Sequence, residues 1–168
     1  LCRAAGSSSD NTAANLAVDA IGGARTFTAF MRSIGDDKTR LDRREPELNE
    51  ATPGDARDTT TPIAAARSLQ TLLLDGVLSA PARNELTQWM LGDQVADALL
   101  RAGLPRDWQI ADKSGAGGHG SRSIIAVVWP PKRSAVIVAI YITQTAASMS
   151  ASNQAVSRIG SALAKALQ

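Results

Sequence analysis

The pattern of apolar residues changes once along this chain, near Pro105, and this change limits the folds open to it. Before Pro105, apolar residues recur at helical spacing, whereas residues 124–129 and 136–142 are β-branched runs typical of strands. Residues 150–168 return to helical spacing. An order of helices, then strands, then a closing helix predicts an α+β fold in which the last helix packs on one face of the sheet.

The region before Pro105 contains five segments that we expect to be helical, besides a helix-like composition at residues 1–5. Glycines end several of them, and Pro62 lies near the first position of another, where proline is tolerated. The predicted ranges are 11–20, 24–33, 61–75, a helix that begins at 79–81, and 95–100. Residues 42–58 carry many charges and no period, which predicts a long ordered loop.

The second half predicts a three-strand antiparallel meander. Its first strand is expected at residues 108–113, followed by a glycine-rich turn at 115–120 and the two β-branched strands. Three strands are few for a free-standing sheet. We therefore expect the chain to be a portion of something larger.

Composition excludes several kinds of function. The chain has 168 residues, 44% of them hydrophobic, and a net charge of +2, as expected of a soluble globular domain. Its basic residues are scattered, which argues against nucleic-acid binding, and no apolar run approaches the roughly 20 residues of a membrane span. No signal segment opens it. One histidine and one cysteine cannot build a metal site, so we expect neither a metal nor a cofactor.

Three short motifs could carry chemistry. They are Ser9-Asp10-Asn11, Glu45-Pro46-Glu47-Leu48-Asn49, and Lys113-Ser114-Gly115 at the end of a predicted strand. Each is common by itself, because the first is typical of a helix N-terminus and a lone glutamate in a polar loop is usually solvated. Their joint occurrence in this order, with Arg122 on the next strand, is specific.

Together these motifs match most of what a serine acyl-transfer site requires. Such a site needs a serine, a base, oxyanion donors, a proton relay and a cation for a substrate carboxylate. The chain offers candidates for all but the first two. A Ser-x-x-Lys motif is absent, and the nearest string, Ser161 to Lys165, is one residue too long.

Residues 9–16, 43–50, 55–62 and 111–117 resemble class A serine β-lactamases, and the similarity extends from Cys2 to the last helix. The resemblance implies a β-lactamase/transpeptidase-like fold of which this chain is the C-terminal portion. Residues 1–91 would belong to the all-helical domain, with an omega loop at 42–58. Residues 92–168 would supply strands and the C-terminal helix of the α/β domain.

The resemblance also implies a role for each site residue. Catalytic roles would fall to Ser9, which relays a proton to the β-lactam nitrogen, to Glu45 with Asn49, which activate the deacylating water, and to Lys113, which sets the positive potential. The substrate-binding residues would be Asn11, Ser114, Gly115, Ala116 through its backbone N–H, and Arg122.

Further features implied by the resemblance concern the loop and the lone cysteine. Arg43 and Asp58 would form an ion pair, and the Glu45–Pro46 bond would be cis. Arg44 stands where the family often has Trp, and His119 would lie at the rim of the site. Cys2 would form a disulfide with the missing N-terminal segment, although a buried free thiol is the alternative from the residues alone.

We therefore expect hydrolysis of β-lactam antibiotics in the periplasm or outside the cell, with this chain inactive alone. One alternative is a penicillin-binding or sensor relative that is acylated without turnover, which would lack the Glu45 and Asn49 pair. The other is a non-catalytic fragment.

Overall fold

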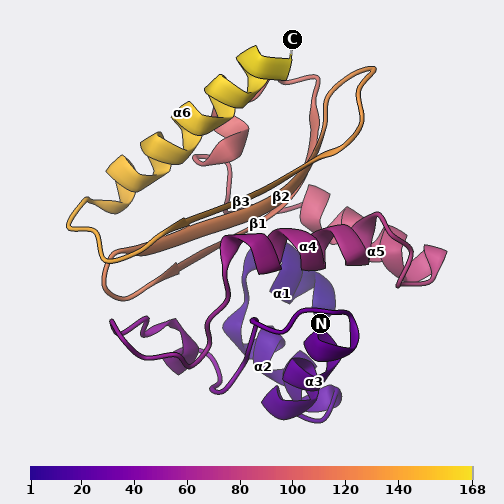
Figure 1. Cartoon of the computed structure of the whole chain (residues 1–168), viewed down its shortest axis with the longest axis vertical. Helices are drawn as coiled ribbons and strands as arrows, with labels where there is room; N and C mark the ends of the chain where they lie inside the picture. Colours follow the sequence, from indigo (N-terminus) through magenta and orange to yellow (C-terminus); the bar gives the residue numbers. More distant parts are fainter. Residues whose placement is uncertain (168) are drawn as a thin grey trace.

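Three antiparallel strands form the centre of the computed structural model, which describes residues 1–167 (Figure 1). The strands are β1 (Gln109–Gly117), β2 (Ser121–Trp129) and β3 (Val136–Ile142), in the order β1-β2-β3. The α-helices are α1 (Cys2–Ser8), α2 (Asn11–Ala20), α3 (Ala24–Ser33), α4 (Pro62–Leu73), α5 (Ala80–Leu91) and α6 (Met149–Leu167), and the short 3₁₀ helices are η1 (Glu47–Asn49) and η2 (Leu100–Gly103). The predicted α+β class and antiparallel meander are confirmed.

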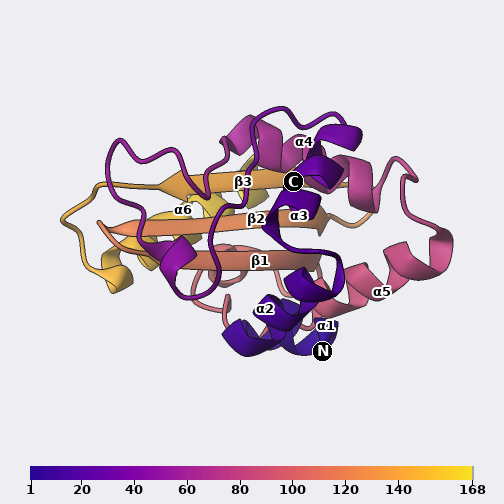
Figure 2. The same ribbon diagram turned by 90° about the horizontal axis from the view of Figure 1, so that it is seen from below.

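The two faces of the sheet are covered by different helices. Figure 1 shows α6 along one face, with α4 and α5 on the other, and Figure 2 shows α1, α2 and the loop 42–58 on that second side. Helix α6 packs on one face, as the sequence predicts. No helix among residues 1–167 has the length and apolarity that crossing a membrane requires.

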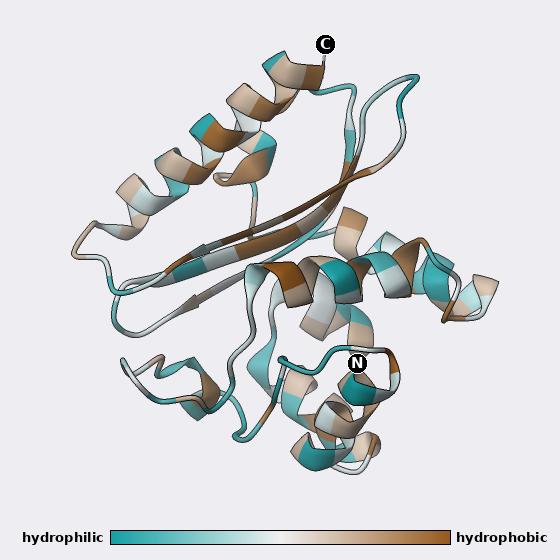
Figure 3. Ribbon diagram, viewed as in Figure 1, coloured by the Kyte–Doolittle hydropathy of each residue, from teal (hydrophilic) through white to brown (hydrophobic). Residues whose placement is uncertain are grey.

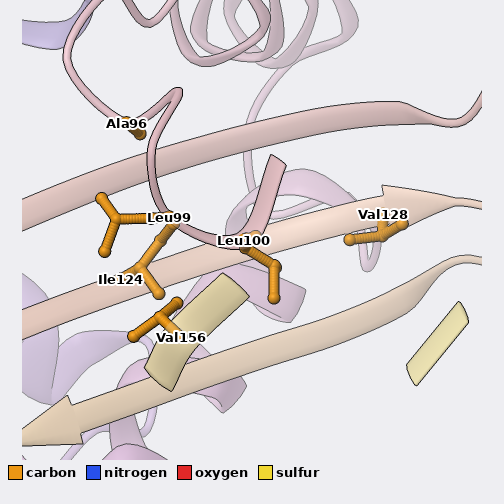
Figure 4. Packing of buried hydrophobic residues seen from close by; sticks show 7 residues of the cluster. Ala96, Leu99, Leu100, Ile124, Val128 and Val156 are labelled. Carbon is orange, nitrogen blue, oxygen red and sulfur yellow. The ribbon is translucent and has the colours of Figure 1, made fainter. Parts of the chain in front are cut away.

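Strand β2 supplies the apolar core on both faces, because successive side chains of a strand point to opposite sides. Ile124 and Val128 pack with Val156 of α6, in a cluster that Figure 4 shows closely. Val127, between them, packs with Leu69 of α4 on the opposite face. Figure 3 shows the hydrophobic colour concentrated along the strands, between the helical layers. Such burial on both faces explains why β2 is a nearly continuous apolar run.

Helix α6 meets η2 with almost no side chains between the two backbones. A Cβ added at Gly103 would lie 1.9 Å from the carbonyl oxygen of Ser157, and one at Gly160 would lie 2.7 Å from that of Leu100. Both distances are too short for any side chain. The contact therefore requires glycine at both positions.

The predicted helices at 11–20 and 24–33 and the helix beginning near residue 80 are confirmed, and the helix predicted at 61–75 spans 62–73. The first residues belong to α1, which begins at Cys2. The last predicted helix is α6, and its final residue, Gln168, lies outside the described part.

Two predicted ranges are wrong. Residues 95–100 form turns instead of a helix, because the Asp93 carboxylate accepts a hydrogen bond from the Val95 N–H and bends the chain there; only η2 is helical. Strand β1 continues to Gly117, through half of the predicted turn 115–120. Its glycines favour a turn locally, but they pair with Ser121–Ser123 of β2 and stay extended.

Candidate functional site

The junction between α1 and α2 presents the first motif. Asp10 is the N-cap of α2, and its carboxylate accepts a hydrogen bond from the Ala13 N–H at 2.8 Å. Ser9 ends α1 in the left-handed region, with φ of 54°. The motif is thus a helix cap, as its residue types indicate, and it also places Ser9 and Asn11 on the wall of a cavity.

Asn15, one turn after Asn11, holds the backbone of the second motif. Its side-chain amide donates to the Glu45 carbonyl at 2.9 Å and accepts from the Glu45 N–H at 2.9 Å. The Glu45–Pro46 bond is cis, as predicted. The 3₁₀ turn η1 then brings Asn49 back so that its side-chain amide donates to the Glu45 carboxylate. Backbone and side chain of Glu45 are therefore both fixed.

The loop 42–58 is closed at its neck by Asp58. The Asp58 side chain is 3% exposed, and its carboxylate accepts from the backbone N–H groups of Asp42 and Arg43 and from Arg43 Nε, at 2.6, 2.9 and 2.6 Å. The predicted ion pair is confirmed. Arg44, where the family often has Trp, pairs with Asp19 of α2 at the surface.

Lys113 lies on β1, an edge strand, with its ammonium in contact with the Ser9 hydroxyl. Burial lowers the pKa of Lys113, while the negative charges of Asp93 and Asp112 act against that effect. An edge strand also leaves one row of backbone N–H and C=O groups unused by the sheet. In β1 that row includes groups that can approach a ligand in the cavity.

Arg122 reaches β1 from the neighbouring strand. Strand pairing places Ala116 opposite Arg122, so the side chains of Ser114 and Arg122 share a face, as their predicted joint role requires. The Arg122 guanidinium donates to the Gly115 carbonyl at 3.0 Å and to Asn153 Oδ1 of α6 at 2.9 Å. Burial lowers the pKa of the Arg122 guanidinium and also limits the screening of its positive charge by water.

The loop and β1 touch backbone to backbone. The Gly118 N–H donates to the Asn49 carbonyl at 2.8 Å. A Cβ at Gly117 would lie 2.5 Å from that same oxygen, and a Cβ at Gly118 would lie 2.3 Å from the Glu50 carbonyl oxygen. These two glycines therefore let the loop carrying Glu45 sit directly against the strand carrying Lys113.

All of the predicted catalytic and binding residues meet in a single cavity of about 340 Å³. Its walls come from the α1–α2 junction, the loop and the end of β1. The predicted residues among them are Ser9, Asn11, Glu45, Asn49, Lys113, Ser114, Gly115, Ala116 and Arg122. His119 is exposed, in the turn after β1, and does not line the cavity.

Sequence reasoning assigned no role to two residues that support the site. Asn15 has a usable signal, because it lies four residues after Asn11 and therefore on the same face of a helix. Asn153 is one polar residue in a long helix, and only the packing of α6 brings it to Arg122.

Residues 1–167 match the model of the β-lactamase enzyme family. The chain is similar to β-lactamase AER-1 of Aeromonas hydrophila, with 68% identity over 160 residues, which are 95% of this chain and 53% of that protein. It is similar to β-lactamase CARB-3 of Pseudomonas aeruginosa, with 52% identity over 159 residues, 95% of this chain and 55% of that protein. The chain thus spans about half the length of these curated relatives.

The chain is also similar to solved structures of β-lactamases. An ancestral class A β-lactamase superposes with a TM-score of 0.97 at 51% identity, over 98% of this chain and 64% of the other. The chromosome-encoded β-lactamase of Vibrio parahaemolyticus superposes with a TM-score of 0.96 at 48% identity, over 99% of this chain and 64% of the other.

Proposed function

The chain belongs to the class A β-lactamase family, and from this premise we propose that it supplies the substrate-binding and deacylating part of an enzyme that hydrolyses β-lactam antibiotics through a serine acyl-enzyme. The observation that carries the proposal is that side chains suited to proton transfer, carboxylate binding and water activation line one cavity. Those three tasks, together with a nucleophile, make up the reaction.

Proton transfer during acylation would use the contact between Ser9 and Lys113. The Ser9 hydroxyl can accept the proton that the attacking serine loses. It can then pass its own proton to the β-lactam nitrogen as the amide bond breaks. The Lys113 ammonium donates to that hydroxyl and fixes its direction. A positive group at this place also favours the developing negative charge of the tetrahedral intermediate.

Deacylation would use Glu45 as the general base. Asn49 fixes the carboxylate and Asn15 fixes the backbone, so a water held between Glu45 and Asn49 would be positioned before reaction. Glu45 would take a proton from this water as the water oxygen attacks the acyl carbon; the ester bond to the reactive serine would then break, and the serine oxygen would take up a proton. A positioned base typically contributes 10²–10⁴-fold to rate.

Substrate binding would use the cations Lys113 and Arg122 and the open edge of β1. Arg122 and Ser114 would bind the substrate carboxylate, and Asn11 would bind the amide of the substrate side chain. The Ala116 N–H would donate to the oxyanion, with Gly115 permitting close approach. The second oxyanion donor would be the N–H of the reactive serine.

The nucleophile must come from a segment outside these 168 residues, because none of them forms a Ser-x-x-Lys motif. We therefore expect the chain alone not to hydrolyse β-lactams. Cys2 is exposed and unpaired, which leaves it available for a disulfide to that segment. Intact mass without reductant tests this: a species that falls to 17.5 kDa on reduction supports the link, and 17.5 kDa in both samples contradicts it.

The alternative is a penicillin-binding or sensor protein that is acylated and does not turn over. The hydrogen-bonded Glu45 and Asn49 favour turnover, because a protein that keeps its acyl group has no need of a positioned base.

We also propose a division near residue 91 between helical and α/β parts, an omega-loop role for residues 42–58, and a periplasmic or secreted location, all by analogy with the family.

Reconstitution tests the proposal. The chain would be mixed with the part of the Aeromonas hydrophila relative that it does not match, and hydrolysis of a chromogenic cephalosporin would be followed. We expect turnover only when both pieces are present. Glu45→Gln should lower turnover about a thousandfold while mass spectrometry detects the accumulated acyl-enzyme.

The matched control is Glu47→Gln, which removes an exposed carboxylate from the same loop and should leave turnover unchanged. Equal turnover of the Glu45→Gln and unchanged complexes would refute the role of Glu45. Acylation of the unchanged complex with no turnover would favour the sensor alternative.

A further inference from the structure

Helix α2 contacts the loop 42–58 through two residues that lie one turn apart. Asn15 binds the backbone of Glu45 in both directions, and Asp19 binds the side chain of Arg44. Residues four positions apart share a face of a helix, and Arg44 immediately precedes Glu45 in the chain. One face of α2 therefore holds two consecutive residues of the loop, one by its backbone and the other by its side chain.

The contact between Arg44 and Asp19 is a two-pronged ion pair. One terminal nitrogen of the guanidinium, Nη1, donates to Asp19 Oδ1, and the other, Nη2, donates to Asp19 Oδ2 at 2.9 Å. This hydrogen bonding lowers the pKa of the Asp19 carboxyl and raises the pKa of the Arg44 guanidinium. Two parallel hydrogen bonds fix the direction of the pair as well as its distance.

The pair is exposed, but the backbone beside it is already ordered. The Arg44 side chain is 54% exposed and that of Asp19 is 47% exposed, and such pairs usually contribute little because ordering two side chains opposes their attraction. Here Asn15 holds the backbone of the next residue, Glu45. Arg44 therefore has less freedom to lose, and the two contacts should reinforce each other.

Helix α2 alone does not explain the acid at position 19. Asp19 is the last residue but one of α2, and a negative charge is unfavourable near the C-terminus of a helix, where the free carbonyl groups concentrate negative potential. Its ion pair with Arg44 offsets that repulsion. The carboxylate thus serves the contact with the loop.

Residue 44 also begins the turn that carries Asn49. The Arg44 carbonyl accepts a hydrogen bond from the Leu48 N–H at 2.9 Å. Asn49 follows directly, and its side-chain amide donates to the Glu45 carboxylate. A shift of residue 44 would therefore move Glu45 and Asn49 together.

We propose that Arg44 and Asp19 are positioning residues that form, with Asn15, a two-point clamp holding Glu45 on α2, and that salt weakens this clamp. Salt screens exposed charges strongly, whereas the neutral amide hydrogen bonds of Asn15 are far less affected. The importance of the clamp for deacylation rests on the proposed function, whereas the clamp itself does not.

Charge reversal and rescue test the clamp in the 168-residue chain. The Glu45 N–H donates to Asn15, so its exchange with solvent, measured by NMR, reports opening of the clamp. Arg44→Asp should accelerate this exchange about threefold, within what an exposed ion pair contributes. Adding Asp19→Arg restores a pair of opposite charges and should recover most of the protection. Acceleration that the double variant does not reverse would overturn the proposal.

The single variant Asp19→Arg separates the clamp from the stability of α2. A cation is favourable in the last turn of a helix, so a role of Asp19 in the helix alone predicts slower exchange at Glu45. The clamp predicts the opposite sign, because two arginines would then face each other. Slower or unchanged exchange would count against the clamp.

The matched control is Arg57→Asp. Arg57 makes a similar two-pronged contact with Asp55, at 2.7–3.1 Å, but both residues belong to the loop. This variant changes the charge of the loop as Arg44→Asp does and should leave exchange at Glu45 unchanged. Equal acceleration by the two variants would refute the clamp, since the effect would then follow the net charge of the loop.

A salt titration needs no variant and therefore does not depend on any substitution folding. Raising NaCl from about 0.01 M to about 1 M shortens the screening length from about 30 Å to about 3 Å. Exchange at Glu45 should accelerate relative to that of amides in α4, which lies outside the loop. A ratio of the two rates that is independent of salt would contradict the proposed ionic contact.

The reconstituted complex tests what the clamp does for the reaction. Arg44→Asp should slow deacylation about threefold and leave acylation unchanged, and adding Asp19→Arg should restore deacylation, as single-turnover kinetics would show. Equal slowing of both steps would indicate a general loss of structure and would remove the positioning role. The exchange measurements do not involve hydrolysis, so failure of reconstitution and failure of the clamp are distinguishable.

Discussion

The loop 42–58 and the sheet beside it are stabilised by different forces. Strand β2 is held by apolar side chains such as Ile124 and Val127, both fully buried. The loop has no such core, and its position depends on Asp58 at the neck and on Asn15, which binds the backbone of Glu45 near the start of the loop. Hydrophobic burial is insensitive to pH, whereas the loop depends on ionised and hydrogen-bonded groups.

This difference matters because the candidate site lies where the two regions touch. The sheet supplies the cations Lys113 and Arg122, and the loop supplies Glu45. The cations should therefore stay in place under conditions that displace the carboxylate. Four substitutions or conditions test this contrast, from the largest expected effect to the smallest.

Ile124→Ala should destabilise the whole chain. Removing a fully buried aliphatic side chain between β2 and α6 costs about 4 kcal/mol in free energy of unfolding. Urea denaturation followed by circular dichroism would measure it. Ile159→Ala, on the exposed side of α6, is the control and should cost much less. Equal losses in the two variants would contradict the assigned core.

Asp58→Ala should release the loop without unfolding the sheet. The variant loses three hydrogen bonds to a buried carboxylate, a local cost of about 3 kcal/mol. Amide hydrogen exchange should accelerate in residues 42–58 and remain slow in β2. Asp55→Ala, which breaks only a contact with Arg57 two residues away, should have a smaller effect. Global loss of protection in Asp58→Ala would mean that the two regions are not separable.

Acid should weaken the segment just before the loop, because the Asp36 carboxylate joins residues 38–39 to α4. Burial acts to raise the pKa of this carboxyl, but hydrogen bonds from Thr39, Ser68 and Lys38 outweigh it and hold the pKa at about 2, below the ordinary 3.8. The stabilisation is complete above pH 4 and is lost as the pH falls through the folded-state pKa, by about 2 kcal/mol.

Stability measured by urea denaturation between pH 5 and 2 would detect this loss. Asp36→Asn should be less stable at pH 5 and should lack this part of the acid dependence. A pH profile that is the same in both proteins would show that other groups control acid sensitivity.

Asn15→Ala should have the smallest effect on stability. It removes the two hydrogen bonds to the Glu45 backbone and should cost about 1.5 kcal/mol. Faster amide exchange at Glu45 is the expected signature. Asn11→Ala, one turn earlier on the same helix and with no bond to the loop, provides the comparison. Identical exchange at Glu45 in the two variants would remove Asn15 from the site.

The contrast between the apolar sheet and the hydrogen-bonded loop also explains what could be predicted from the sequence. The strands and most helices follow from periodicity, because apolar burial repeats every 2 or 3.6 residues. The candidate site residues were predicted from three motifs in one order, with Glu45 between Ser9 and Lys113, and the resemblance implied their roles. The cis bond before Pro46 and the pair of Arg43 with Asp58 were likewise implied by resemblance and are confirmed.

The errors arise where pairing with a neighbouring strand, or a hydrogen bond from one side chain, overrides local preference. The glycines of β1 read as a turn, and only pairing with β2 keeps them extended. Residues 95–100 read as a helix, and the carboxylate of Asp93 bends them. The bonds from Asn15 to Glu45 join residues 30 positions apart, a relation that no local pattern contains.

The glycine contact between α6 and η2 has a consequence far from where it lies. Because a side chain at Gly103 or Gly160 would collide with the facing backbone, any larger residue there would push α6 away from η2. Asn153 is seven residues, or two turns, earlier on that helix and therefore points in nearly the same direction. Because Asn153 accepts a hydrogen bond from the Arg122 guanidinium, two glycines outside the candidate site help to position the group that we propose binds the substrate carboxylate.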